Sequence, residues 1–223
     1  MQKALNIIKR VLMYLLGLLI IAVGINFSKM SGLGISPVSS IPRALEVIWG
    51  FTLGTMVIVI YCVLVLAQIL VLRKKFEIKN ILGVPVALIF GTMVDFVGID
   101  KKAFGHLLAD FPRPSNYFLQ LVFLVASIII IGIGVYIYLK PNLVPMPAEG
   151  LASAISKVSG KPFGDCKTFV DVGLIVTALI LQLIFLGGFK SFTGANVVVR
   201  EGTILSAVCV GQVVKLLNKW FNK

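Results

Sequence analysis

The sequence predicts an all-α polytopic membrane protein of about six transmembrane helices, arranged as two inverted three-span repeats that each contain a short re-entrant or broken helix. Three observations support this prediction. Of the 223 residues, 58% are hydrophobic and only 13% are charged, whereas about a quarter of a soluble domain is charged. Six long runs with few or no charges follow one another along the chain. The two halves of the chain also align with each other at a constant offset of 110 residues.

The composition excludes several classes of protein. A chain with a mean hydropathy of +1.02 is too apolar for a soluble enzyme, a disordered chain or a nucleic-acid-binding domain. The net charge of +12 therefore indicates how the loops are oriented in a membrane, and no nucleic acid is expected as a partner. The three cysteines, Cys62, Cys166 and Cys209, form no spaced metal or disulfide pattern. We expect neither a metal nor a cofactor.

The six predicted spans follow from the positions of the charged residues. A spanning helix needs about 20 mostly apolar residues. Runs of suitable composition cover residues 11–28, 47–72, 80–99, 115–139, 172–189 and 202–214. The third run contains Asp95, and the sixth is short unless Leu216 and Leu217 extend it. Together the spans predict a single membrane domain over residues 1–223.

Two further stretches are helical in pattern but too polar to be obvious spans. They cover residues 37–49 (PVSSIPRALEVIW) and 147–158 (PAEGLASAISKV). A helix of about 12 residues is roughly 18 Å long, which is about half the thickness of a bilayer. Each starts at a proline, Pro37 or Pro147, after an irregular segment that interrupts the preceding helix. This pattern predicts re-entrant or broken helices.

The distribution of Lys and Arg orients the chain. With a cytoplasmic N-terminus, six spans and both short helices entering and leaving on one side, 14 of the 21 basic residues fall in cytoplasmic segments. Cytoplasmic loops of membrane proteins carry such an excess. If the first short helix crossed instead, the cluster from Arg73 to Lys79 would lie outside, which weakens the bias. We therefore expect both termini in the cytoplasm.

The two halves of the chain, residues 1–110 and 111–223, resemble each other. Aligned without a gap, they share nine identities over 45 positions, including three glycine pairs and the pair Pro37 and Pro147. Each half contains three crossings, an odd number, so the second half must be inserted upside down. Inverted repeats of this kind occur in many secondary transporters. A duplication without a transport role is the alternative.

The starts of the two short helices are the predicted site. By inverted symmetry one short helix enters from each side, so the two N-termini meet near the midplane. Free N–H groups and the positive dipole end of a helix favour an anion or a carboxylate-bearing solute. The alternative is that both segments are tight structural turns. The predicted substrate-binding residues belong to the two short helices and the first span: Ser36, Ser39, Ser40, Arg43, Glu149, Gly150, Ser153 and Asn26.

Arg43 and Glu149 break the symmetry of the repeat in charge. In the alignment Ser39 corresponds to Glu149, and Arg43 corresponds to Ser153. An ionisable side chain within a membrane is costly, and it is by default a functional hypothesis. If burial raises its pKa, Glu149 can bind the coupling proton. Arg43 can pair with Glu149 or with a substrate anion. The alternative for both residues is a structural ion pair or an interfacial position.

Several other polar residues have structural interpretations. Asp95 is expected at a helix end or an interface, and Lys167 and Asp171 are expected to pair on a helix surface. His106 is the only histidine and falls in a loop, so neither a histidine metal site nor a serine–histidine mechanism is indicated. Three amides are expected to line a cavity or to bond between helices: Asn26, Gln68 and Gln182.

Three segments resemble a known bacterial family. They read GLGISPVSSIP, VPMPAEGLASAISKVSGKPFGDCKTFVDVGL and VREGTILSAVCVGQVVKLL. The chain is similar here to the YczE/YyaS/YitT family of integral membrane proteins, and the resemblance covers most of its length. PMPAEG and the stretch from GKPFG to the following aspartate are its most specific parts. The resemblance implies a multi-pass protein of the bacterial cytoplasmic membrane, without implying a substrate.

The leading functional hypothesis is a small-solute secondary transporter or carrier with a site between the two broken helices. The expected partners are the lipid bilayer, a small solute, and a proton or ion that couples to its movement. A non-transporting accessory protein that organises or stabilises a partner complex is the alternative, and it predicts dry, tightly packed polar segments. An enzyme is not expected, because the sequence shows neither a nucleophile with a base nor a metal cluster.

Overall fold

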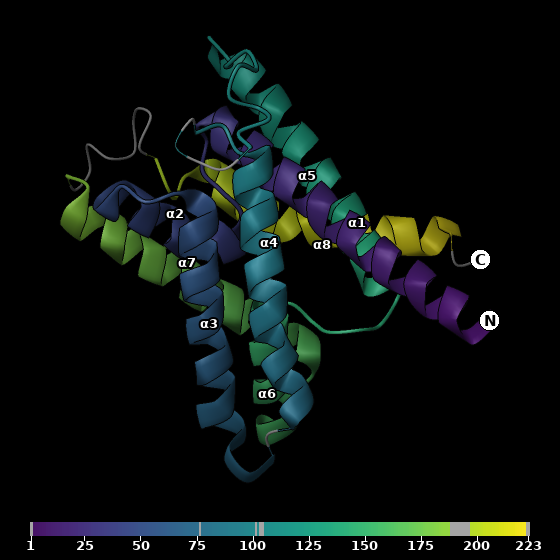
Figure 1. Ribbon diagram of the computed structural model, residues 1–223. Helices are drawn as coiled ribbons and strands as arrows, with labels where there is room; N and C mark the ends of the chain where they lie inside the picture. The colour runs from purple at the N-terminus through teal and green to yellow at the C-terminus, as the bar shows by residue number, and fades with distance from the viewer. Residues whose placement is uncertain (1, 76, 101, 103–104, 188–196, 222–223) are drawn as a thin grey trace.

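The computed structural model describes residues 2–75, 77–100, 102, 105–187 and 197–221, and in these residues it contains helices and no strand (Figure 1). Short 3₁₀ turns cover Arg73–Lys75 and Ile78–Leu82. The α-helices are α1 (Gln2–Ser31), α2 (Pro37–Trp49), α3 (Leu53–Leu72), α4 (Gly83–Val97), α5 (Tyr117–Leu139), α6 (Pro147–Ser159), α7 (Phe163–Phe185) and α8 (Glu201–Phe221).

Six helices in the described part of the chain are long and apolar enough to cross a membrane. They are α1, α3, α5, α7, α8, and α4 together with the turn before it. The predicted number of spans and the all-helical class are therefore confirmed. The sixth span is longer than its uncharged run, because α8 continues through Lys215 and Lys219 to Phe221. Both lysines are exposed, so the helix continues without burying their charges.

The two short helices are built in the same way. Pro37 and Pro147 each occupy the first turn, and each follows an extended residue, Ser36 or Met146, with nearly the same backbone angles (φ −58°, ψ 150° and φ −59°, ψ 151°). Proline fits the first helical turn because the amide that it lacks has no partner there. Both helices end at a left-handed glycine with φ of 74° or 72°. The expected short helices are thus present, and their bounds differ by 110 residues at both ends.

Helices α1 and α5 pack along each other at two glycines. A Cβ atom on Gly24 of α1 would lie 3.0 Å from the backbone nitrogen of Ile131. A Cβ atom on Gly134 of α5 would lie 2.8 Å from the backbone nitrogen of Ile21. Small residues allow such close approach of helices in membranes. Since Ile21 and Gly24 align with Ile131 and Gly134, each helix presents the same surface to the other.

The remaining helices pack around this pair. Helix α2 lies against α7, and α6 lies against α3. Helix α4 packs on α3 and α1, whereas α8 packs on α5. Figure 1 shows α2 near the start of α3 and α6 near its end, so the two short helices lie at opposite ends of the molecule. Within the described residues, α7 and α8 do not pack along each other as α3 and α4 do.

Asp95 joins α4 to the start of α3. Its carboxylate accepts hydrogen bonds from the Gly54 backbone amide at 2.8 Å and from the Thr52 hydroxyl at 2.6 Å. Gly54 and Gly91 allow α3 and α4 to approach, since a Cβ atom on either would overlap the backbone oxygen of the other. The expectation of an end-capping or interface position for Asp95 is confirmed.

The three predicted buried amides are buried and bond between segments. Asn26 donates to the Val94 carbonyl of α4 at 3.0 Å, and Gln68 donates to the Pro147 carbonyl at 3.0 Å. Gln182 accepts a hydrogen bond of 2.7 Å from the backbone amide of Val199. These bonds satisfy backbone groups near helix ends, where the intrahelical ladder leaves partners missing.

Candidate functional site

The first turns of α2 and α6 line one cavity of about 440 Å³. Helices α1, α3, α5, α7 and α8 complete its wall. Most of the lining is apolar, as is usual for a small-molecule site with a few placed polar groups. The polar and charged lining residues are Ser36, Ser39, Tyr61, Glu149, Lys167, Thr168, Asp171, Ser206 and Lys215.

Equivalent positions of the two halves line this cavity together. Ser39 on α2 and Glu149 on α6 both line it, as do Tyr61 on α3 and Asp171 on α7. The first half contributes neutral side chains at these positions, whereas the second half contributes carboxyl groups. Six pairs of lining residues are related by the offset of 110: 21 and 131, 25 and 135, 36 and 146, 38 and 148, 39 and 149, and 61 and 171.

The polar groups at the starts of α2 and α6 differ in their hydrogen-bond partners. The Ser36 hydroxyl donates to the Ser39 hydroxyl at 3.3 Å, and both residues are buried. Glu149 reaches back to the backbone amide of Met146, the residue before α6. This is half of a capping box, in which a carboxylate at the third helical position satisfies an amide of the N-cap. The Oε2 atom of Glu149 is buried and has no hydrogen-bond partner among the described residues.

Glu149 lies on α6, outside the six candidate spanning helices, and its carboxyl is buried. Burial raises the pKa of its carboxyl to about 7, against the opposing effects of Lys167 and of the Met146 amide. Desolvation penalises the charged form of a carboxyl, so the neutral form persists to higher pH. A pKa near neutral allows the group to gain and lose a proton under physiological conditions.

Lys167 and Asp171 form the predicted pair on α7. The Lys167 ammonium bonds to both carboxylate oxygens of Asp171, at 2.6 Å for Oδ2. The pair is partly buried and lines the cavity, so it is more than the surface pair that the spacing indicates. Lys215 of α8 brings a second ammonium to the same wall. The cavity therefore contains two basic groups and two carboxyl groups.

Comparison with known proteins identifies the family of the chain. Residues 8–219 match DUF6198, which is described as a family of unknown function. The chain belongs to this family. It is 27% identical over 169 residues to the uncharacterized protein YyaS of Bacillus subtilis, covering 76% of this chain and 79% of YyaS. It is 25% identical over 208 residues to an uncharacterized protein of Haemophilus influenzae, covering 93% of this chain and 82% of that protein. No solved structure matches significantly.

These relatives confirm the resemblance to bacterial proteins of the YczE/YyaS type. Combined with the six apolar helices, they indicate a multi-pass membrane protein of bacteria. The DUF6198 match extends over both halves of the chain.

In this DUF6198 chain, three of the predicted site residues meet at the cavity: Ser36, Ser39 and Glu149. Four others lie nearby but outside its lining. Ser40 donates to the Pro37 carbonyl at 2.6 Å, and a Cβ atom on Gly150 would contact the Gln68 amide. Ser153 is half-buried on α6, and Asn26 is committed to backbone carbonyls. The contacts of Ser40, Gly150 and Asn26 thus join or stabilise helices around the cavity.

Arg43 does not lie beside Glu149, although the predicted ion pair requires this. Its guanidinium bonds to Glu46 at 2.6 Å, one turn along α2, in a separate pocket of about 440 Å³. Lys29 bonds to Glu46 and to Asp100 in the same region. Arg43 does not contact Glu149 because α2 carries it toward Gly50, away from the cavity at the start of the helix. We call Lys29, Arg43, Glu46 and Asp100 the ion cluster.

Sequence reasoning missed part of the site. Tyr61, Ser206 and Lys215 line the cavity, yet each lies within or beside an apolar run and carries no local signal. The alignment of the two halves offers one clue, because Tyr61 aligns with Asp171 and both residues are polar. Among the described residues, no three His, Cys, Asp or Glu side chains gather as a metal site would need.

Proposed function

We propose that this protein is a small-solute secondary transporter or carrier whose site is the cavity between α2 and α6. One observation supports this above all: the first turns of both short helices line the same cavity of about 440 Å³. A volume of this order accommodates a small metabolite. The accessory-protein alternative predicts dry, packed segments in this place, so the cavity favours transport.

We further propose that residues 1–110 and 111–223 are inverted repeats, with α2 and α6 re-entrant. Reciprocal contacts support this: Gly24 meets Ile131 as Gly134 meets Ile21. Contacts in which the same surface is used twice are typical of a two-fold axis. The pairing of α2 with α7 and of α6 with α3 follows the same exchange. In this arrangement the protein lies in the cytoplasmic membrane with both termini in the cytoplasm.

The asymmetry of the packing supports alternating access. Helix α4 packs along α3, but α7 and α8 are apart within the described residues. The cavity lining continues through this gap to Gly164 and Lys215, toward the end of the molecule where the termini lie. At the opposite end, Lys29 bonds to Glu46 and Asp100 and ties α1 to α2 and to the segment after α4. Rocking of one repeat against the other would exchange the open and closed ends.

The charges of the cavity support a carboxylate-bearing or otherwise anionic solute with a proton as coupling ion. Two lysines line the cavity. Lys167 is paired with Asp171 on α7, whereas Lys215 is not part of that pair. The start of α2 adds the positive end of a helix dipole. Glu149 supplies the proton site. Its uncharged form removes a repulsion for an anion, so proton and solute bind together favourably.

The test is a solute screen followed by uptake. The full-length protein in detergent is screened by thermal shift against small mono- and dicarboxylates, amino acids and inorganic phosphate, and stabilising compounds are then tested for uptake into liposomes. We expect uptake of at least one anionic solute and its loss in Glu149→Gln. Arg43→Ala should bind the solute normally but transport it poorly, because it weakens the ion cluster alone. Normal uptake by Glu149→Gln would refute the site.

A second measurement tests the opening directly. In a variant with all three cysteines replaced by alanine, Ser206→Cys should react with a membrane-impermeant thiol reagent from the side of the termini and not from the other. Ser127→Cys is the matched control, because Ser127 and Ser206 are both buried but only Ser206 lines the cavity. If neither cysteine reacts with the thiol reagent, the interior is dry and the accessory role is favoured.

A further inference from the structure

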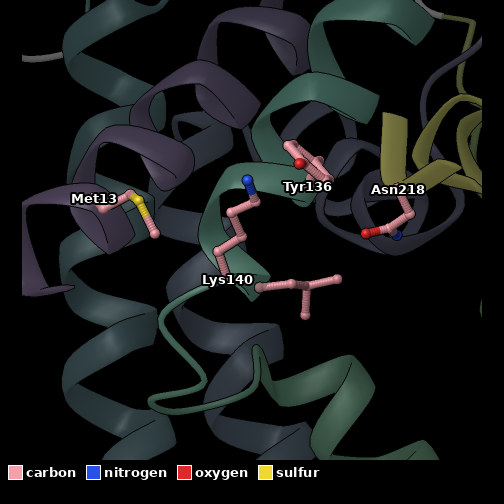
Figure 2. Close-up of a pocket in the computed structure, with 5 residues that line it drawn as sticks. Met13, Tyr136, Lys140 and Asn218 are labelled. Atoms are coloured by element: carbon pink, nitrogen blue, oxygen red, sulfur yellow. The ribbon is translucent and has the colours of Figure 1, made fainter. Parts of the chain in front are cut away.

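A second pocket lies away from the cavity, where the C-terminal parts of α5 and α8 meet α1. It has a volume of about 520 Å³ and is lined by Met13, Tyr136, Leu139, Lys140 and Asn218. Figure 2 shows Lys140 between Met13 and Tyr136, with Asn218 reaching toward the same space from α8. The Lys140 ammonium lies 4.5 Å from the centroid of the Tyr136 ring, which holds it at the pocket through a cation–π contact.

The three helices that line this pocket contain many more basic than acidic residues. Helices α1 and α5 contain no Asp or Glu, and α8 contains only Glu201, at its far end. Arg10 of α1 donates a hydrogen bond of 2.7 Å to the carbonyl of Pro141, next to Lys140. Exposed basic side chains on or directly after these three helices include Lys9, Arg10, Lys140 and Lys219. Their charge favours an anionic ligand.

The pocket also offers a neutral donor. Tyr136 is 8% exposed, and its hydroxyl has no hydrogen-bond partner among the described residues. A buried hydroxyl without a partner is costly, and an acceptor oxygen from a ligand would relieve that cost. Asn218 adds an amide to the lining. An ammonium, a hydroxyl and an amide together match the oxygens of a phosphate group.

Apolar side chains beside the pocket indicate that the phosphate is carried by a lipid. Leu12, Leu16 and Leu216 are exposed, and Trp220 and Phe221 are exposed at the end of α8. Aromatic side chains of this kind lie at the membrane–water interface, where lipid headgroups are found. Acyl chains can cover the leucines while the headgroup occupies the pocket.

We propose that this pocket binds the phosphate headgroup of an anionic phospholipid, at the membrane face where both termini of the chain lie. Basic pockets between transmembrane helices recognise anionic headgroups in this way. The site shares no lining residue with the α2–α6 cavity and stands whether or not the protein transports a solute.

The experiment is a lipid titration of the full-length protein in detergent, followed by native mass spectrometry. The probes are dioleoylphosphatidylglycerol, dioleoylphosphatidylcholine and inorganic phosphate. We expect phosphatidylglycerol to bind more tightly than phosphatidylcholine, and Lys140→Gln to weaken it by roughly fivefold, the share of one basic residue near the surface. Tyr136→Phe should weaken it by a smaller factor. Lys161→Gln is the control, because Lys161 is exposed on the segment before α7.

Equal affinity for phosphatidylglycerol in the unaltered protein and in Lys140→Gln would overturn the proposal, as would equal binding of the two lipids. Displacement of the lipid by millimolar inorganic phosphate would show a free-anion site and would overturn the lipid assignment. The thermal midpoints of the lipid-free variants check folding; the Lys140 ammonium makes a ring contact and should tolerate replacement.

Discussion

Ser39 and Glu149 occupy the same position in two helices whose bounds differ by 110 residues, and both line one cavity. The serine bonds to its own N-cap residue, whereas the glutamate keeps one carboxylate oxygen without a partner among the described residues. A similar backbone therefore presents a neutral group from one half and a titratable group from the other. This difference makes Glu149 the most informative position for experiment.

Glu149 should make the stability of the protein pH-dependent. Burial raises the pKa of its carboxyl from 4.5 to about 7, so its contribution to stability is full below pH 4.5 and is lost as the pH rises through 7. The titratable groups nearby are Lys167, Asp171, Tyr14 and Tyr61. Thermal midpoints in detergent, measured at increasing pH from mildly acidic to mildly alkaline buffer, should fall for the unaltered protein.

Glu149→Gln should flatten that profile and exceed the unaltered protein in thermal midpoint on the alkaline side, because the amide carries no charge to desolvate. Asp165→Asn serves as the matched control, since Asp165 is an exposed carboxylate in the first turn of α7. A profile that stays the same after Glu149→Gln would show that another group titrates.

Gly24 and Gly134 should be intolerant of even one extra carbon. Gly24→Ala and Gly134→Ala each force a Cβ atom against the facing backbone at about 3 Å, so each should destabilise the protein by about 1–3 kcal/mol. Gly173→Ala on α7 is the control, because a Cβ atom there would meet no other atom within 4 Å and alanine favours helix. Denaturant or thermal unfolding in detergent measures the change. Comparable stability of all three variants would argue against close α1–α5 packing.

Asp95 should stabilise the start of α3. Asp95→Ala removes the acceptor for the Gly54 amide and the Thr52 hydroxyl, and we expect a loss of about 1–2 kcal/mol, the usual cost of losing a helix cap. Asp95→Asn keeps one acceptor oxygen and should lose less. Hydrogen exchange at the first turn of α3 reports the effect locally, and unchanged protection in Asp95→Ala would contradict the capping role.

The stability that the ion cluster provides should require both Lys29 and Glu46. Lys29 and Glu46 are almost fully buried, so Lys29→Met should cost about 3–5 kcal/mol because it leaves a buried carboxylate short of a partner. The double variant with Glu46→Leu should recover much of that loss. A double-mutant cycle on unfolding free energies measures the coupling, and a coupling near zero would show that the two charges act independently.

Asp100 should make the stabilisation from the ion cluster sensitive to low pH. Burial opposes its ionisation, but Lys29, Glu46 and Arg43 together outweigh burial and lower the pKa of Asp100 below 3.8. The stabilisation from Asp100 is therefore present above pH 3.8 and lost as the pH falls through the lowered pKa. Asp100→Asn should show a smaller loss of thermal midpoint on acidification through this range than the unaltered protein.

The helices were predictable because their signals are local. Uncharged runs predict the six spans, and the prolines at residues 37 and 147 mark where both short helices begin. Helix ends were less predictable: α1 includes the exposed Lys9 and Arg10 and the buried side chain of Lys29, and α8 continues through the exposed Lys215 and Lys219. The ion cluster was not predictable at all: Lys29 reads as the end of an apolar run, and its partners lie 17 and 71 residues away.

Only the part of the candidate site that the alignment of the two halves indicates was predictable from the sequence. Ser36, Ser39 and Glu149 were predicted from the proposed repeat, and the structure places all three at one cavity. Arg43 was misplaced, because its direction along α2 depends on where that helix packs against α7. Lys215 lines the wall where α7 and α8 do not pack along each other within the described residues, and no sequence pattern indicates this.

The ion cluster has a consequence for biosynthesis. Lys29 cannot be neutralised by Asp100 until 71 more residues have been made, which takes roughly 4–14 s at typical translation rates. Glu46 follows Lys29 after only 17 residues and can pair with it first, so during that interval the ammonium has one of its two carboxylate partners. Every partner in the cluster nevertheless belongs to the first 100 residues. The first half of the chain can thus form its ion pairs before the second half, which completes the cavity, has been synthesised.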